Sequence, residues 1–237
     1  MIRIFDDLQQ LSRATAQLIC DHAKKNISEQ GSFSIVLSGG ETPRTTYSML
    51  TEIFFSDQID WDRVKIFFGD ERYVPQNDAR SNFKMVNETL LRHVPIPNEN
   101  IFPIPADSTP EEDAMKYEEI LKKNFSTPFP QFDFMLLGLG ENGHTASLFP
   151  HTNVLHEKTR WVKEVFIEEQ KSFRITLTVP PINASKQIVF LVAGKNKAQT
   201  LYNVLNGSRN PDQLPAQLIR GEIIWMVDRE AGKLLNE

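Results

Sequence analysis

Apolar runs rich in β-forming residues recur along the chain, separated by polar stretches. Most of these runs are continuous rather than alternating, which is typical of strands that are covered on both faces. The runs that we predict to be strands cover residues 33–37, 64–68, 132–137, 175–179, 188–192 and 223–227.

Segments with helical periodicity lie between these runs. Apolar residues from Leu8 to Ile27 recur at a spacing of three and four, which predicts an amphipathic helix over roughly residues 7–30. The sequence Thr109-Pro110-Glu111-Glu112 is a capping box with proline at the first helical position, so another helix begins there. Further helices are predicted over residues 43–54, 81–93, 196–206 and the C-terminal end. Alternating strands and helices imply right-handed crossovers, and therefore an α/β fold with a mainly parallel sheet.

Length and charge limit the classes of protein to consider. The chain has 237 residues, at the top of the range for one domain, and we interpret the proline-rich stretch 94–110 as a stiff connector rather than a boundary. We therefore predict one domain over residues 1–237. The 26 Lys and Arg residues and the 31 Asp and Glu residues leave a net charge of −5, which argues against a protein that wraps nucleic acid or coats an anionic membrane.

Cysteine content and hydropathy exclude further classes. The single cysteine, Cys20, excludes a disulfide scaffold and a multi-cysteine metal site, and its place in a helical pattern predicts a buried residue. No targeting segment is recognisable, and no apolar run approaches the ~20 residues of a membrane helix. We therefore expect a soluble, cytoplasmic protein.

Polar, glycine-rich or charged segments follow four of the predicted strands. Because ligands bind beyond the C-terminal ends of the strands in an open parallel sheet, these segments should meet at one edge. They are Ser38-Gly39-Gly40-Glu41-Thr42-Pro43-Arg44, Gly69-Asp70-Glu71-Arg72, Gly138-Leu139-Gly140-Glu141-Asn142-Gly143-His144-Thr145 and Gly194-Lys195-Asn196-Lys197. Their convergence is a stronger signal than any one of them.

The first of these segments could bind a phosphate. Gly39 and Gly40 would let backbone N–H groups approach an anion, and the helix beginning near Pro43 would add its positive end. A tight turn that needs glycine for its backbone angles is the alternative. The Gly-Lys-Ser/Thr of a Walker loop is missing, and the glycine pattern over residues 138–143 is a weak dinucleotide signal because a histidine follows it.

His144 is the best candidate for a general base among the five histidines. It lies in a glycine-rich loop at the predicted ligand edge, and the ordinary pKa of imidazole suits proton transfer near neutrality. A hydrogen-bonded loop histidine without a catalytic role is the alternative. His151 and His156 follow without the spacing of a zinc site, so no metal is expected. No serine or cysteine nucleophile is recognisable, so any hydrolysis would use activated water.

Charged side chains complete the predicted edge. Asp70, Glu71 and Arg72 follow one strand, and Arg174 and Lys197 belong to segments near two others. Each of them alone could be a loop ion pair or a surface charge. Each becomes a candidate only because its segment is expected at the ligand edge.

Six motifs in a fixed order give the sequence a resemblance to a known family. They are SGGETPRTTY, GDERYVPQNDARSN, LLGLGENGHTASLFP, FRITLTVPPINAS, LVAGKNKA and LPAQLI, and they run from about Leu37 to the C-terminus. They resemble the 6-phosphogluconolactonases of the pentose phosphate pathway, whose wider superfamily also contains glucosamine-6-phosphate deaminases. The resemblance implies a Rossmann-like α/β fold with helices on both faces. It also implies hydrolysis of 6-phospho-D-glucono-1,5-lactone to 6-phosphogluconate without a cofactor.

The same resemblance implies roles for individual residues. Those implied to bind the substrate, mainly through its phosphate, are Gly39, Gly40, Thr42, Arg44, Arg174 and Lys197. Those implied to act in catalysis are His144, which would activate water, Asp70, Arg72 and Asn142.

Asn142 departs from the family pattern, because similar sequences usually carry aspartate there. Its side-chain oxygen can still accept the Nδ1–H of His144, but it lacks the charge that would stabilise an imidazolium. The alternative is that Asn142 only forms a turn with Gly143 and that Glu141 or Asp70 orients the ring.

Two rival functions can be weighed against lactone hydrolysis. A deaminase would use Asp70 for proton transfer, and the resemblance implies that it would carry a glutamate five residues after the histidine, where this chain has Phe149. A sugar-responsive regulator would carry an N-terminal helix-turn-helix that binds DNA. Here one predicted helix precedes the strand over residues 33–37, after which the glycine-rich segment comes. We therefore predict a small phosphorylated sugar lactone as the partner, with no nucleic acid, no membrane and no cofactor. The chain is expected to be a monomer or a homodimer.

Overall fold

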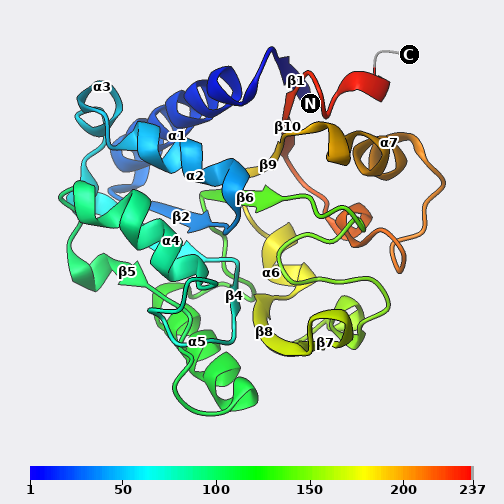
Figure 1. Cartoon of the computed structure of the whole chain (residues 1–237). Coiled ribbons are helices and arrows are strands. Elements are labelled where there is room, and N and C mark those ends of the chain that lie inside the picture. The colour runs from blue at the N-terminus through cyan, green and yellow to red at the C-terminus, as the bar shows by residue number, and fades with distance from the viewer. Residues whose placement is uncertain (236–237) are drawn as a thin grey trace.

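The computed structural model of the chain describes residues 1–235 and has a seven-stranded sheet at its centre (Figure 1). The strand order is β1-β10-β9-β6-β2-β3-β5, and all neighbours are parallel. The strands are β1 (Ile2–Phe5), β2 (Phe33–Leu37), β3 (Val64–Phe68), β5 (Ile101–Phe102), β6 (Phe134–Gly138), β9 (Ile188–Val192) and β10 (Ile223–Asp228). Every residue of β2 and of β9 is buried, so the centre of the sheet is covered on both faces, as the continuous apolar runs predict.

A second sheet of three strands corrects one expectation. Residues 175–177 of the predicted strand 175–179 form the end of β8 (Ser172–Leu177), which lies antiparallel between β4 (Asp70–Arg72) and β7 (Val162–Ile167), whereas Val179 begins a helix. A tight turn joins β7 to β8, with Lys171 at a φ of 45°, and so short a connection allows only an antiparallel pair.

Four strands were not predicted: β1, β4, β5 and β7. β4 and β5 have three and two residues, which is too short for a periodic pattern. β1 lies at the sheet edge and leaves Ile2 and Ile4 exposed, and charged residues interrupt the apolar pattern of β7.

Two of the predicted helices, those over residues 7–30 and from Thr109, begin at a capping side chain. The Asp7 carboxylate accepts a hydrogen bond from the Gln10 N–H at the start of α1 (Leu8–Gln30), and Thr109 caps α5 (Pro110–Asn124) in the same way. The remaining helices are α2 (Glu41–Leu50), α3 (Ile53–Ser56), α4 (Asn82–Thr89), α6 (Val179–Asn183) and α7 (Ala198–Asn206).

Several helix ends differ from the prediction. The helix expected over 43–54 is divided into α2 and α3, because Glu52 adopts an extended conformation between them. The helix expected over 81–93 ends at Thr89, and a 3₁₀ turn follows. At the C-terminal end, Lys233–Leu235 forms a 3₁₀ turn in place of the expected helix, and residues 236 and 237 lie outside the described part of the chain.

Buried apolar residues from both sheets form one hydrophobic cluster, which includes Val36 of β2 and Ile175 of β8. A chain that forms one domain is expected to have one such cluster. The assignment of residues 1–237 to a single domain stays a prediction. Cys20 is buried as expected, and burial raises the pKa of its thiol to about 11. Over residues 1–235, no helix is both long enough and apolar enough to cross a bilayer.

Candidate active site

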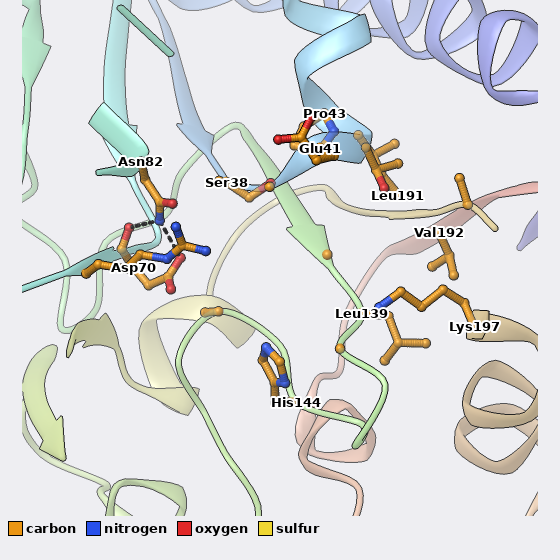
Figure 2. Close-up of a pocket in the computed structure, with 18 of the residues that line it drawn as sticks. Ser38, Glu41, Pro43, Asp70, Asn82, Leu139, His144, Leu191, Val192 and Lys197 are labelled. Carbon is orange, nitrogen blue, oxygen red and sulfur yellow. Dashed lines mark hydrogen bonds between the residues drawn. The ribbon is translucent and has the colours of Figure 1, made fainter. Parts of the chain in front are cut away.

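A cavity of about 400 Å³ opens at the C-terminal ends of β2, β6 and β9, where the predicted segments meet (Figure 2). The predicted site residues that line it are Gly39, Gly40, Thr42, Asp70, Arg72, His144, Arg174 and Lys197. β4 and β8 of the small sheet carry Asp70, Arg72 and Arg174 to its edge. In the view of Figure 2, His144 lies between Asp70 on one side and Lys197 on the other.

Two predicted site residues, Arg44 and Asn142, do not line the cavity. The guanidinium of Arg44 lies 3.2 Å from the carboxylate of Glu41 on the first turn of α2, so its contribution to substrate binding stays a prediction. The side chain of Asn142 contacts the ring of His144, so any effect of Asn142 on the reaction would pass through His144.

The turn after β2 has the geometry of an anion cradle. Gly40 has a φ of 104°, which favours glycine, and it precedes α2 without a side-chain cap. The N–H groups of the first helical turn are therefore available to an anion, which the helix dipole also favours. A Cβ on Gly39 would lie 1.8 Å from Oδ1 of Asn82, so the turn itself also requires glycine. The two interpretations of this segment are thus compatible.

Three contacts hold the imidazole of His144. Its Nδ1 lies 2.6 Å from Oδ1 of Asn142, so the neutral ring donates its Nδ1–H there and leaves Nε2 free to accept a proton. The ring stacks on Phe149, with centroids 4.0 Å apart and 14° between the planes. Gly140 packs so closely that a Cβ there would lie 2.0 Å from Nδ1. The orienting role of Asn142 therefore has the geometry that it needs.

The surroundings of His144 favour its neutral form. Burial has the largest effect and, together with the cations Arg174, Lys197 and Arg72, lowers the pKa of His144 to about 4, while Asp70 acts in the opposite direction. Such an imidazole remains unprotonated at neutral pH and can take a proton from water.

Asp70 and Arg174 belong to one buried network. Oδ2 of Asp70 accepts a hydrogen bond from the Ser147 hydroxyl at 2.6 Å and lies 3.8 Å from Nη1 of Arg174. The Asn82 amide donates to the backbone oxygen of Asp70 at 2.9 Å. Nη2 of Arg174 donates to the Gln170 side-chain oxygen at 2.6 Å. Both charged groups are thus fixed by neutral polar neighbours before any substrate binds.

Four residues that contact Asp70, His144 or Arg174 were not predicted to do so: Asn82, Ser147, Phe149 and Gln170. Asn82 and Ser147 lie within the motifs that carry the resemblance, but an uncharged polar residue gives no sign in a sequence of the partner that it faces. Phe149 also lies within such a motif, but a phenylalanine gives no sign in a sequence of the ring on which it stacks.

The two histidines after the loop have other partners. Nε2 of His151 lies 3.0 Å from the Gln213 side-chain oxygen, and Nε2 of His156 lies 3.5 Å from the Asp212 carboxylate. Within residues 1–235, no group of three or more His, Cys, Asp or Glu side chains is gathered in the way that metal ligands are.

Substitution of Asn142 tests its hydrogen bond to His144. We expect Asn142→Asp to keep the acceptor and add a negative charge, which favours the imidazolium and raises the pKa of His144 by about one unit. The acidic limb of kcat/KM, expected at a pH of about 4 in the unaltered protein, should move to higher pH while the neutral plateau is kept. Asn142→Leu removes the acceptor and should lose activity. An unmoved limb in Asn142→Asp together with an active Asn142→Leu would leave Asn142 as a turn residue only.

Comparisons with known proteins agree with the fold and the site. Residues 6–225 match the family model of glucosamine-6-phosphate isomerases/6-phosphogluconolactonase, and the chain therefore belongs to this family. A 6-phosphogluconolactonase of Synechocystis is 42% identical, over 90% of this chain and 88% of its own. One of Nostoc is 37% identical over 99% and 98%. The crystal structure of 6-phosphogluconolactonase from Thermotoga maritima has a TM-score of 0.84 at 30% identity, covering 96% of this chain and 99% of its own. These findings confirm the predicted family and its Rossmann-like α/β fold.

Proposed function

We propose that this chain hydrolyses 6-phospho-D-glucono-1,5-lactone to 6-phospho-D-gluconate, with water activated by His144 and without a covalent intermediate or cofactor. One observation carries the proposal: a neutral, oriented imidazole shares a cavity with a glycine cradle and two cationic side chains, Arg174 and Lys197. The reaction belongs to the oxidative pentose phosphate pathway. We place it in the cytoplasm, with the chain acting as a monomer or a homodimer.

The chemistry follows from the position of His144. Nε2 takes a proton from water as the water oxygen attacks the lactone carbonyl, and the tetrahedral oxyanion meets the guanidinium of Arg72. The oxyanion then collapses, the bond to the ring oxygen breaks, and the imidazolium returns its proton to that oxygen. Asp70, which opposes the other effects on the pKa of His144, stabilises the imidazolium between these two steps.

The phosphate, remote from the reacting carbon, supplies binding and orientation. Gly39, Gly40 and Thr42 would surround it, and Arg174 and Lys197 would neutralise it. Burial lowers the pKa of both cations, because each loses part of its hydration. A bound phosphate would offset that loss, and therefore phosphorylated substrates are favoured.

A two-substrate assay tests the proposal against a sugar-phosphate deaminase. We expect acid release from freshly prepared 6-phosphogluconolactone to exceed the spontaneous rate, and no ammonia to form from glucosamine 6-phosphate. Phe149 supports this outcome because its ring, which cannot titrate, stacks directly on His144. Ammonia release without lactone hydrolysis would replace the proposal by the deaminase.

Removal of either cation that is proposed to bind the phosphate should affect phosphorylated substrates more than unphosphorylated ones. We expect Arg174→Ala and Lys197→Ala each to raise KM for the phosphorylated lactone about 10- to 100-fold, the value of one lost charge-assisted contact, with little change for gluconolactone. Lys195→Ala is the matched control, because Lys195 lies on the same turn as Lys197 but outside the cavity lining. Equal losses on both substrates would show a structural or catalytic role instead.

A further inference from the structure

One aromatic ring contacts both the proposed base and the proposed phosphate-binding arginine. The imidazole of His144 stacks on Phe149 at 4.0 Å, and Cζ of Arg174 lies 5.3 Å from the centroid of the same ring. Phe149 is only 4% exposed and is not among the residues that line the cavity. Any effect of Phe149 on the reaction therefore passes through His144 and Arg174.

We propose that Phe149 is a positioning residue that fixes the imidazole of His144 and the guanidinium of Arg174 relative to each other and keeps water away from the face of the imidazole that it covers. The proposal rests on the proposed function for the reaction that these groups serve. Two contacts of different kinds are needed to direct Nε2: the hydrogen bond to Asn142 holds Nδ1, and the stack holds the plane of the ring. The backbone oxygen of Phe149 accepts a hydrogen bond from the Thr152 hydroxyl at 2.7 Å, which anchors the residue that carries the ring.

The charges around His144 explain why an apolar neighbour matters there. The groups that act on its ring are Asp70 and Arg72 of β4, Arg174 of β8 and Lys197 of the turn before α7. Three of these four groups are cations, and they repel an imidazolium. An imidazolium at this position therefore depends on water molecules that solvate it. The Phe149 ring occupies space where water would otherwise solvate the imidazolium, in line with burial as the leading cause of the lowered pKa of His144.

Replacement of Phe149 by leucine removes the stack and keeps an apolar side chain. We expect Phe149→Leu to move the acidic limb of kcat/KM upward by about one pH unit or more, because a better hydrated imidazole is protonated more easily. At neutral pH, kcat should fall about 10-fold because the imidazole is less well oriented. KM should rise because the guanidinium of Arg174 loses its contact with the Phe149 ring. Phe149→Tyr, which keeps the ring, should restore the position of the limb.

Phe55→Leu is a matched control for this experiment. Phe55 is also buried, pairs with the ring of Phe54 at 4.9 Å and has Cζ of Arg13 5.6 Å from its centroid, but it lies on α3, away from the cavity. We expect Phe55→Leu to lower the thermal unfolding temperature without moving the pH profile. An identical pH profile in Phe149→Leu and in the unaltered protein would overturn the proposal.

Proton NMR of the His144 ring tests the positioning role of Phe149 without substrate, and therefore independently of the proposed function. In the unaltered protein, the stack should shift the His144 ring protons upfield, and their titration midpoint should lie well below the ordinary pKa of an imidazole. In Phe149→Leu the ring-current shift should vanish and the midpoint should rise. If Phe149→Leu does not fold, a His144 resonance without a ring-current shift in the unaltered protein would still refute the stack. Absence of lactonase activity in the unaltered protein would instead refute the proposed function.

Discussion

His144→Ala is expected to lower kcat by about 10²-fold or more while the protein remains folded, since this is the contribution of a positioned general base. The effect should be large because no other histidine lines the cavity within the described residues, so nothing nearby can replace the imidazole. Initial rates on 6-phosphogluconolactone, corrected for spontaneous hydrolysis, provide the measurement.

His156→Ala is the matched control for this variant. His156 lies twelve positions later, is exposed and faces Asp212, so its loss should leave kcat unchanged. Circular dichroism and thermal unfolding of both variants separate catalysis from folding. Near-normal turnover in a folded His144→Ala protein would remove His144 from the mechanism.

Gly140→Ala should reduce kcat by about 10²-fold without removing any functional group. The added Cβ would lie 2.0 Å from Nδ1 and 2.1 Å from Cε1 of His144, so the ring must move and its hydrogen bond to Asn142 must break. A displacement of about 1 Å at a reacting group can cost this much. The measurement is kcat at neutral pH together with the thermal unfolding temperature.

Gly69→Ala serves as the comparison for Gly140→Ala. Gly69 also follows a strand, but a Cβ there would make only an ordinary contact of 3.4 Å with Val36. We expect the Gly69→Ala protein to retain its activity. If Gly140→Ala retained full kcat as well, the close packing of His144 would have no part in catalysis.

The sequence predicted most of the candidate site because the topology of a parallel sheet is itself a spatial rule. Segments that follow strands must meet at one edge, and this rule placed Gly39, Asp70, His144 and Lys197 together before any contact was known. The bond between Asn142 and His144 was also within reach, because the two residues are two positions apart in a tight loop.

Contacts between distant segments were beyond such reasoning. The Ser147 hydroxyl meets Asp70 across 77 positions, and Asn82 packs on Gly39. The antiparallel return of β8, which sets Arg174 opposite Arg72, was missed because the apolar run of β8 matches that of a buried parallel strand.

The sequence by itself determined the parallel sheet, the glycine turn after β2 and the family, and it singled out the histidine that lines the cavity, because strand and turn propensities, motif order and spacing are local properties of a chain. Only the tertiary structure decided that Phe149 stacks on His144, that β4 and β8 pair, and that Arg44 does not line the cavity but pairs with Glu41, which does. Spacing specifies which backbone segments form an element. The partner of a side chain, in contrast, depends on which surfaces the whole chain brings together when its apolar residues are buried, and neighbours in sequence do not determine this.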